Sequence, residues 1–416
     1  PMSSDQVIWS EQNRLHVAYN DVDVNAAGVA SNILEFAVGG VGKNFVENVI
    51  SANQTIVILD PAGVELKALV TASSTAAAVA SITVTPYTQA DLTGLALTGL
   101  KIFVYGSEYD KGVSVTNSTG SGDATGYKTV NPSFTQFSNS PIIIRNKFVV
   151  SGSDMAQIGW VEVATEDGTG GYLWYLKAES ETRLRFEDYL EMAVVEGELK
   201  GGTSTAAVKG TQGLFAAIKD RGNTNVGFTA AGGLATFDEI LKNLDTQGAI
   251  EENMLFLNRQ TSLDFDDMLA GVGAGSVYAG GSSYGVFENS EDMALNLGFS
   301  GFRRGSYDFY KTDWKYLNDA STRGAIGGVE ASIEGVLVPA GTSTVYDQIL
   351  GTNIRRPFLH VRYRASQADD RRMKSWLTGS AGGAMSSDLD AMEVNFLSER
   401  CLCVQAANNF VLFQGV

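Results

Sequence analysis

One segment restricts the fold more than any other, because residues 172–196 carry the longest helical pattern of the chain. An apolar stripe repeats there at helical spacing, through Phe186, Tyr189, Leu190 and Ala193. Gly197 follows as a stop signal. At about 1.5 Å per residue, such a helix is roughly 40 Å long and can cross a whole domain.

The polar side of this helix is expected to hold two ion pairs. Glu179 precedes Arg183 by four residues, and Glu181 precedes Arg185 in the same way. A helix is stabilised more by this order, with the acid nearer the N-terminus, than by the reverse order. We therefore expect both pairs on the exposed surface of the helix.

The chain before this helix has a different period. Four runs rich in β-branched residues read as strands, at 55–59, 64–70, 81–85 and 100–105. Asp60-Pro61-Ala62-Gly63 separates the first two runs and places proline and glycine at preferred turn positions. Residues 29–50 carry only a weak helical pattern, which glycines interrupt. The sequence therefore predicts an N-terminal arm over 1–49 and a β-rich unit over 50–130.

A polar, glycine-rich loop at 117–126 leads to a predicted β-hairpin over residues 141–151. Two apolar runs, 142–144 and 148–150, flank the charged tip Arg145-Asn146-Lys147. Because the tip is polar, it is expected to protrude beyond whatever the base of the hairpin packs against. We treat Arg145, Asn146 and Lys147 as candidate contacts between subunits.

Helices and strands alternate farther along the chain. Thr236 and Glu239 form a capping box that predicts a helix, and Gly248 lies beyond its end. Thr261 is expected to cap a second helix after a short strand at 254–258. Such a mixture of elements is typical of the α+β class.

The last third of the chain contains a loop and several strands. Residues 271–285 hold too many glycines for regular structure and predict a mobile loop. Strands are expected at 333–338, 358–363, 393–397 and 401–404. Internal repeats are absent from the sequence.

The charge of the chain argues against a surface that grips nucleic acid. The net charge is −17 and the pI is about 4.6, whereas binding to a phosphate backbone requires a basic surface. With 44% hydrophobic and 19% charged residues, the chain is expected to be globular rather than disordered. Packaged DNA is compatible with this charge only as an enclosed neighbour.

Targeting and redox signals are weak. Cys401 and Cys403 are too close in sequence for an unstrained disulfide, so nothing indicates an oxidising compartment. The first 12 residues lack the basic flank and apolar stretch of a secretory signal, and no run approaches the roughly 20 apolar residues that span a bilayer. We expect a protein made in the host cytoplasm; for Pro1 we favour removal of the initiator methionine, and maturation cleavage stays open as the alternative.

Catalytic motifs fail when they are read position by position. The two histidines, His16 and His360, are far apart, and no G-x-S-x-G motif is present. The phosphate-loop-like stretch before Lys43 has Ala37 where the first glycine belongs. The calcium-loop-like stretch from Asp21 lacks both its glycine and its terminal glutamate. The sequence therefore predicts no enzyme activity, cofactor or metal.

Two clusters contain residue types that occur in reactive sites. Asp264, Asp266 and Asp267 resemble an acid/base or metal cluster, but Asp264 fits the first turn of a capped helix better. Cys401 and Cys403 lack metal-site partners and are expected to pack inside a terminal strand.

One basic region interrupts the acidic background. It spans residues 355–374 and contains Arg355, Arg356, Arg362, Arg364, Arg371, Arg372 and Lys374. Asp369 and Asp370 lie inside this region and no aromatic ladder accompanies it, so salt bridges explain it better than nucleic-acid binding. The six arginines are candidate contacts between subunits.

From residue 131 onward, the order of elements resembles the capsid fold of tailed bacteriophages that is named after the Hong Kong 97 phage. The resemblance rests on Asn131-Pro132-Ser133-Phe134-Thr135-Gln136-Phe137, on Phe148-Val149-Val150-Ser151-Gly152-Ser153, and on the long helix that follows. The strand at 254–258 between two capped helices resembles the core of the family's axial domain. The arginine-rich segment and residues 393–404 resemble the closing sheet of its peripheral domain.

The resemblance implies an α+β fold with an extended hairpin loop and a spine helix. It places the extended loop at 131–160, the peripheral domain with the spine helix at 161–213, the axial domain at 214–355 and the return to the sheet at 356–416. The β-rich unit over 50–130 is additional to the compact members of the family. The expected loop at 271–285 would lie at the centre of a capsomer.

The function that the resemblance implies is that of a major capsid protein in the virion. Such a chain forms hexamers and pentamers that tile an icosahedral shell around double-stranded DNA. It meets portal, scaffolding and decoration proteins, without sequence-specific DNA binding and without a membrane. Two alternatives stay open: another repetitive virion or surface protein, such as a tail or adhesin component, and an acidic hydrolase.

Overall fold

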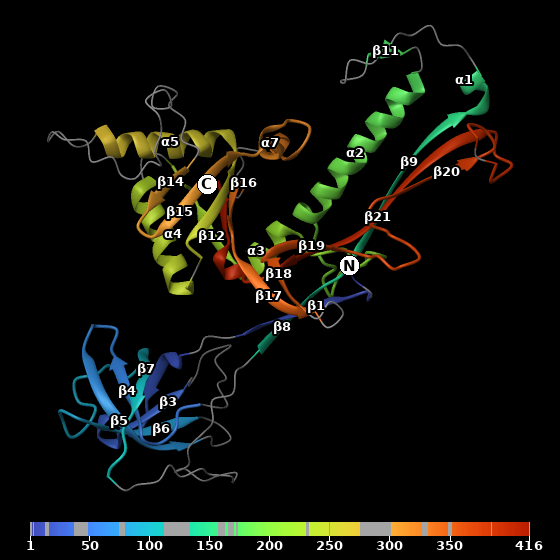
Figure 1. The fold of residues 1–416 in the computed structure, drawn as a ribbon. Coiled ribbons are helices and arrows are strands. Elements are labelled where there is room, and N and C mark those ends of the chain that lie inside the picture. Colours follow the sequence, from blue (N-terminus) through green and yellow to red (C-terminus); the bar gives the residue numbers. More distant parts are fainter. Residues whose placement is uncertain are drawn as a thin grey trace. The chain divides into compact units, whose positions relative to one another are not determined.

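The computed structural model describes most of the chain, in two compact units. Its described residues are 2, 4–12, 16–36, 49–74, 80–111, 134–156, 163–164, 170–171, 174–229, 233–248, 250–274, 301–326, 332–347, 352–383 and 385–415. Ser10–Thr135 form one unit, and Pro1–Trp9 together with Gln136–Val416 form the other (Figure 1). We call them the barrel unit and the main unit.

The barrel unit is a closed barrel of antiparallel strands in the order β2-β3-β6-β5-β4-β7. The strands are β2 (Ala18–Val24), β3 (Ile33–Phe36), β4 (Gln54–Leu59), β5 (Glu65–Ser74), β6 (Ser81–Pro86) and β7 (Leu100–Ser107). Alternate residues point inward and form one core that contains Leu34, Ile56, Ile58, Ile82 and Ile102. The barrel has no open edge among the described strands, because its first and last members pair with each other.

The predicted turn at Asp60-Pro61-Ala62-Gly63 is confirmed between β4 and β5. The Gly63 N–H donates to the Asp60 carbonyl oxygen at 2.9 Å, and Gly63 has a φ of +91°, which favours glycine. The Asp60 carboxylate also accepts from the backbone N–H of Ala96, at 2.6 Å. A local sequence signal therefore fixed this corner of the barrel.

The expected boundary of the β-rich unit differs from the structure. The unit begins at Ser10 instead of residue 50, because β2 and β3 belong to the barrel. The weak helical pattern over 29–50 was wrong in its described part, where a 3-10 turn at Val29–Ser31 precedes β3. Residues 33–36 form a strand because alternate side chains, Leu34 and Phe36, are buried in the barrel core. The glycine-rich loop expected at 117–126 lies outside the described residues.

In the main unit, the long helix is confirmed as α2 (Trp174–Glu196), and it ends directly before Gly197. It lies along a sheet of four strands: β9 (Ile142–Ser151), β19 (Leu359–Tyr363), β20 (Lys374–Gly379) and the 14-residue β21 (Ala391–Val404) (Figure 1). We call this the helix-backed sheet. Phe186 and Leu190 of α2 are buried against Phe396, and the rings of Phe186 and Phe396 stack at 5.7 Å.

The ion pairs on α2 differ from the expected ones. Lys177 pairs with Glu181 at 3.9 Å, and Arg183 pairs with Glu187 at 3.2 Å. The base precedes the acid in both, so Arg183 takes the acid that follows it instead of Glu179. Both pairs are exposed and contribute little to stability.

The hairpin expected at 141–151 was wrong. Residues 142–151 form one continuous strand, β9, which pairs with β21 in antiparallel register over ten residues. Arg145, Asn146 and Lys147 lie in the middle of this strand, opposite Leu397, Phe396 and Asn395. The alternation of inward residues continues through Asn146, so the charged residues interrupt only the outward side of a strand.

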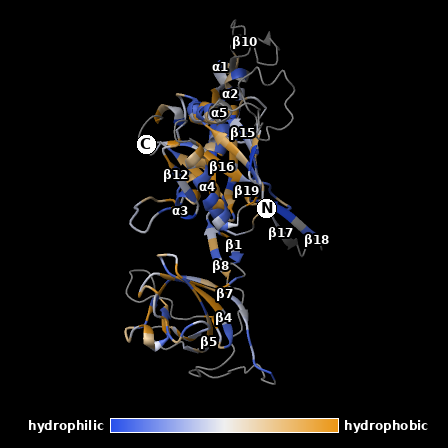
Figure 2. Cartoon of the chain, turned by 90° about the vertical axis from the view of Figure 1, so that its left-hand side faces the viewer, coloured by the Kyte–Doolittle hydropathy of each residue, from blue (hydrophilic) through white to orange (hydrophobic). Residues whose placement is uncertain are grey.

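A second sheet of the main unit has six strands, in the order β12-β22-β16-β13-β15-β14. They are β12 (Asn223–Val226), β13 (Glu252–Leu257), β14 (Gly301–Arg304), β15 (Tyr307–Asp313), β16 (Ile333–Pro339) and β22 (Val411–Gln414). Its apolar strands stand out around β16 in Figure 2. Since β22 follows β21 after a short turn at Ala407–Asn409, the chain runs directly from the helix-backed sheet into this one.

Helices cover both faces of the six-stranded sheet. On one face, α4 (Gly233–Gln247) and α5 (Arg259–Ala274) pack through a core centred on the buried rings of Phe237 and Phe265. On the other face lie α3 (Leu214–Arg221), α7 (Lys315–Asn318) and the C-terminal end of α2. At the margin of the first core, the Tyr307 hydroxyl donates to Asp245 at 2.6 Å.

The capping predictions for α4 and α5 were wrong. Helix α4 begins at Gly233, so Thr236 lies inside it, although Gly248 does end it with a φ of +68°. Asn258 caps α5, since its side-chain oxygen accepts from the N–H of Thr261 at 2.7 Å. The short strand is confirmed as β13, and the loop expected at 271–285 begins as the end of α5 and then lies outside the described residues.

The remaining elements are short. Two strand pairs are β1 (Val7–Gln12) with β8 (Phe134–Asn139), and β17 (Thr342–Asp347) with β18 (Thr352–Pro357). A small hairpin pairs β10 (Val163–Ala164) with β11 (Gly170–Gly171), between α1 (Gly152–Ala156) and α2. A 3-10 turn covers Arg323–Ile326. The mixed content confirms the α+β class.

Candidate assembly surface

The helix-backed sheet has one face covered by α2 and one face turned away from it. We call the second face the open face; its residues include Arg145, Lys147, Lys374, Trp376, Glu393 and Glu399. Arg145 on β9 and Lys374 on β20 lie opposite Leu397 of the central strand, one on each side. The structure therefore brings together two basic segments that are more than 200 residues apart in the sequence.

An aromatic ring lies between these cations. The guanidinium carbon of Arg145 is 6.0 Å from the ring centroid of Trp376, and the Lys374 ammonium is 5.8 Å from it. Lys374 also pairs with Asp369 at 2.8 Å, whereas Arg145 forms no ion pair with any described residue. Both cation–ring distances fall within the range of cation–π attraction. The open face thus presents a half-buried tryptophan with an exposed, unpaired arginine beside it.

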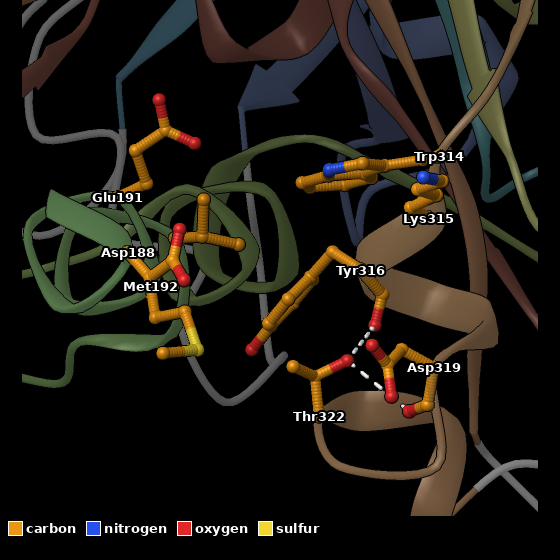
Figure 3. Close-up of a pocket in the computed structure, with 9 residues that line it drawn as sticks. Asp188, Glu191, Met192, Trp314, Lys315, Tyr316, Asp319 and Thr322 are labelled. Atoms are coloured by element: carbon orange, nitrogen blue, oxygen red, sulfur yellow. Dashed lines mark hydrogen bonds between the residues drawn. The ribbon is translucent and has the colours of Figure 1, made fainter. Parts of the chain in front are cut away.

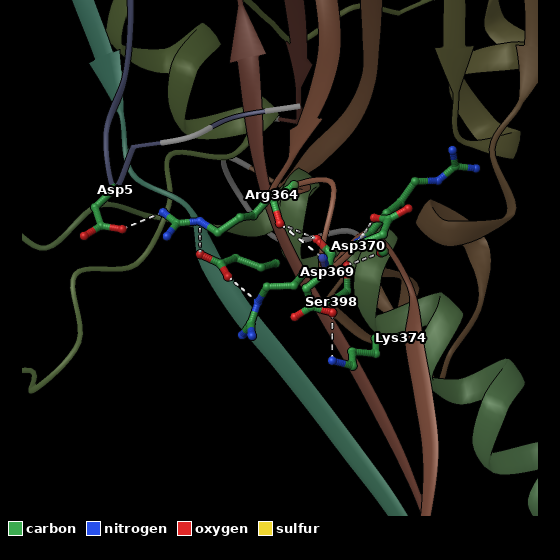
Figure 4. A network of polar contacts seen from close by, with 10 residues as sticks. Asp5, Arg364, Asp369, Asp370, Lys374 and Ser398 are labelled. Carbon is green, nitrogen blue, oxygen red and sulfur yellow. Dashed lines mark hydrogen bonds and ion pairs between the residues drawn. The ribbon is translucent and has the colours of Figure 1, made fainter.

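A buried carboxylate organises the neighbouring part of the open face (Figure 4). Glu399 is only 7% exposed and pairs with Arg364 at 2.9 Å and with Arg371 at 2.7 Å. Arg364 reaches Asp5 as well, at 2.5 Å. The Met2 N–H donates to the carbonyl oxygen of Tyr363. Salt bridges within the chain, which the sequence analysis expected for this region, therefore hold the N-terminal residues against β19.

A third contact runs across three strands of the open face. Lys147 pairs with Glu393 at 2.9 Å, and the Thr378 hydroxyl donates to the same carboxylate at 3.0 Å. The Lys147 ammonium and then the Thr378 hydroxyl lower the pKa of Glu393. Because Lys147 pairs with Glu393, the carboxylate of Glu393 adds little to the charge repulsion on this face of an acidic chain.

Most of the other candidate contact residues lie elsewhere. Asn146 points toward α2, on the covered face, where Arg372 also stacks over the Tyr363 ring at 5.5 Å. Arg362 lies opposite Cys401. Arg355 and Arg356 lie on β18, opposite Thr344 and Ser343, in a two-stranded ribbon whose β18 is hydrophilic in Figure 2. Arg362 therefore shares the open face with Arg145, Lys147, Arg364 and Arg371.

The structure reveals a node that the sequence analysis missed, the buried Asn139 at the end of β8. Its amide nitrogen donates to the carbonyl oxygens of Leu402, at 2.7 Å, and Gln212, at 2.9 Å. Its oxygen accepts from the N–H groups of Gln212 and Ser140 and from the Thr211 hydroxyl. Asn139 thereby ties β8, the segment before α3 and β21 together. No local pattern marks it, since asparagine is common in loops.

Two of the acidic residues of α5, Asp264 and Asp266, have separate partners. Asp266 pairs with Lys311, and both side chains are buried next to the Ser262 carbonyl oxygen. Asp264 accepts from the Gln260 side chain at the helix surface. Within the described part of the chain, no group of three His, Cys, Asp or Glu side chains is placed to hold a metal ion. Helix α5 begins at Arg259, so Asp264 lies beyond its first turn, and the interpretation of Asp264 as a first-turn residue was wrong.

The two cysteines are buried in β21, as expected. Cys401 and Cys403 are free thiols under Met2, Val7 and Trp9 of the N-terminal segment. The neighbouring Cys403 thiol and burial raise the pKa of Cys401. His360 lies opposite Cys403 and its Nδ1 lies 2.8 Å from the Pro357 carbonyl oxygen, so it has a structural contact, whereas His16 is exposed. Across the described helices, none is long and apolar enough to cross a membrane.

Comparisons with known proteins point to phage structures. No protein-family model matches the sequence, and no curated protein matches it either. A structure of Gordonia phage Cozz is similar with a TM-score of 0.37 and 10% identity, over 74% of this chain and 79% of that chain. Microbacterium phage Oxtober96 gives 0.35 and 11%, over 73% and 82%.

A third similar structure is the procapsid of satellite phage P4 including its size determination protein. Its TM-score is 0.33 and its identity is 12%, over 75% of this chain and 83% of that chain. All three are phage structures, and the third is a procapsid. At such low TM-scores and identities, the functional interpretation has to rest on the residues and elements of the chain itself.

Proposed function

We propose that this chain is the major capsid protein of a tailed bacteriophage, with a Hong Kong 97-like fold, and that it is not an enzyme. The observation that carries the proposal is the joint between its two sheets. The 23-residue α2 backs a sheet whose central strand, β21, leads directly into β22, the strand next to the edge strand β12 of a second, helix-covered sheet. This arrangement builds a broad rigid plate, which suits a tile in a shell better than a pocket for a substrate.

The elements correspond to the parts of the proposed tile. Helix α2 is the spine helix, and the helix-backed sheet is the peripheral domain. The six-stranded sheet with α4 and α5 is the axial domain. The small hairpin of β10 and β11, which precedes α2, replaces the segment around Arg145 as the extended loop. The barrel unit is an addition to this plan.

The job of the chain is then geometric. Copies associate into hexamers and pentamers that tile an icosahedral shell around double-stranded DNA, which is enclosed without sequence-specific contacts. Portal, scaffolding and decoration proteins are the further partners of such a shell. We place the protein in the virion after synthesis in the host cytoplasm.

Electrostatics sets a condition on assembly. Each copy carries a net charge of −17, so copies repel one another. The open face offers the unpaired Arg145, together with Lys147 beside its partner Glu393, as cations on an acidic molecule, and interfaces of obligate assemblies, on the order of thousands of Å², add apolar contact. Salt shortens the range of the repulsion to about 10 Å at 0.1 M. Assembly should therefore weaken as salt is lowered, and undiminished light scattering at very low ionic strength would contradict this account.

The decisive experiment is negative-stain electron microscopy of the purified protein and of a charge-reversal variant. Hexamers, sheets or shells are expected for the unaltered chain. Tubes or fibres would instead favour a tail or adhesin component, and lone monomers at high concentration would favour an enzyme.

The variant Arg145→Glu with Lys374→Glu should remain monomeric while its circular dichroism is unchanged. Lys67→Glu with Lys101→Glu, a matched double reversal of exposed lysines on the barrel, should assemble normally. Normal assembly of the double variant would remove the open face from the proposed interface.

A further inference from the structure

Two adjoining cavities lie along the C-terminal half of α2 in the main unit. The first has a volume of about 370 Å³ and lies between Asp188 and Met192 of α2 and the segment from Trp314 to Thr322 (Figure 3). The second has a volume of about 530 Å³ and opens beside it. Glu191, Val195 and Trp314 line both. The second falls within the size range of small-molecule sites, roughly 300–1,000 Å³.

The walls of the second cavity are mostly apolar, with Glu191, His360 and Arg400 as the titratable members. They come from α2, α3, both sheets and the segment before α7, with Leu214, Phe256, Val336 and Leu402 among the contributing side chains. The same core holds buried aliphatic residues behind these walls. A cavity of this kind disfavours water and accepts an aliphatic chain, because each methylene group that enters it is removed from water.

One cation stands in this apolar wall. The Arg400 side chain is half-buried; its Nε donates to the Ser398 hydroxyl at 3.0 Å, and one terminal nitrogen donates to the Arg372 carbonyl oxygen at 3.2 Å. It forms no ion pair with any carboxylate in the described ranges. Burial, followed by the charge of Arg372, lowers the pKa of Arg400. The charge of Glu191 acts in the opposite direction, but from beyond ion-pair distance, so the desolvated guanidinium has no carboxylate in direct contact among the described residues.

We propose that the second cavity binds a single-chain aliphatic monocarboxylate, with the hydrocarbon chain among the apolar walls and the carboxylate paired with Arg400. A second negative charge is disfavoured, because Glu191 lies in the same wall. A neutral alcohol of the same length lacks the ion pair, and an amine meets the positive charge. The inference goes beyond the capsid role and holds whether or not the chain forms shells.

Isothermal titration calorimetry with decanoate, 1-decanol and decylamine, each below its aggregation concentration, tests the proposal. Decanoate should bind at least about tenfold more tightly than decanol, as a hydrogen-bonded ion pair requires. Decylamine should bind most weakly. Equal affinities for decanoate and decanol, or no decanoate binding, would overturn the proposal.

Three variants separate the charge from the cavity. Arg400→Met should keep decanol binding but lose the tenfold preference for decanoate. Val361→Trp, at an exposed strand position that lines the cavity, should block both ligands while circular dichroism stays unchanged. Arg355→Met, at an exposed arginine remote from the lining, should bind like the unaltered chain. A preference for decanoate that survives Arg400→Met would refute the assigned role of Arg400.

Discussion

Replacement of Asn139 by alanine provides a strong test of how the main unit is held together. Five hydrogen bonds converge on this buried side chain. The change leaves the carbonyl oxygens of Gln212 and Leu402 and the N–H of Gln212 without their partner. A buried polar group that loses its partner costs about 1–3 kcal/mol, and partial hydration lowers the sum, so we expect a loss of about 3–5 kcal/mol. That is a large share of a typical domain stability of about 5–15 kcal/mol.

Urea unfolding followed by tryptophan fluorescence measures this loss in the right part of the chain. All 5 tryptophans lie outside Ser10–Thr135, so the signal reports on the main unit alone. Ser375→Ala, at an exposed position on β20 of the same unit, is the matched control and should change the free energy of unfolding by less than about 0.5 kcal/mol.

A second substitution separates the donor role of Asn139 from its acceptor role. Asn139→Asp keeps the acceptor for Gln212 but directs a carboxylate at two carbonyl oxygens. This variant should be strongly destabilised at neutral pH and partly recover in acid, where a protonated carboxyl can donate again. A loss below about 1 kcal/mol for Asn139→Ala would refute the reasoning, and so would an aspartate variant whose relative stability ignores pH.

Three further measurements probe other contacts. Phe186→Ala removes a fully buried ring and should cost about 3–5 kcal/mol, whereas Tyr189→Ala, on the exposed side of α2, should cost less than about 1 kcal/mol; similar losses would contradict the observed orientation of the helix. Glu399→Gln breaks two ion pairs and should cost about 2 kcal/mol, more than Glu393→Gln, whose lysine partner is exposed. Burial and then a hydrogen bond raise the pKa of Tyr307 to about 12, so the stability that it contributes is present below pH 10 and lost toward pH 12. Tyr307→Phe should therefore flatten the decline of the urea midpoint in that window, and an unchanged slope would refute the assignment.

Several elements followed from the sequence because their causes are local. The stripe through Phe186, Tyr189, Leu190 and Ala193 and the stop at Gly197 were sufficient to predict α2, although Tyr189 proved to be exposed and does not belong to the buried side. The turn at Asp60–Gly63 could be predicted from proline, glycine and an aspartate whose side chain accepts a hydrogen bond from the backbone of the turn. In the same way, alternating β-branched residues predicted the strands from β4 to β7.

Pairing between distant segments did not follow from the sequence. The charged residues of β9 suggested a turn, but β9 pairs with β21 over all ten of its residues. Arg145 and Lys147 therefore lie on a sheet instead of at the tip of a hairpin. The runs at 393–397 and 401–404 likewise merge into one strand, since Ser398 and Glu399 pair with β9 and their side chains bond to residues between β19 and β20. A strand's partner is fixed by long-range contacts that no local pattern records.

The open face and the cavity show the same division between local and long-range causes. The sequence by itself determined that an acidic chain carries two basic segments and no complete catalytic motif. Only the tertiary structure decided that Arg145 and Lys374 flank one tryptophan and that Glu399 forms ion pairs with two arginines. It also decided that Arg400 lines an apolar cavity without an ion-pair partner among the described residues. Charge and helical period are properties of neighbouring residues, whereas the partner of each charge depends on which strands the folded chain places side by side.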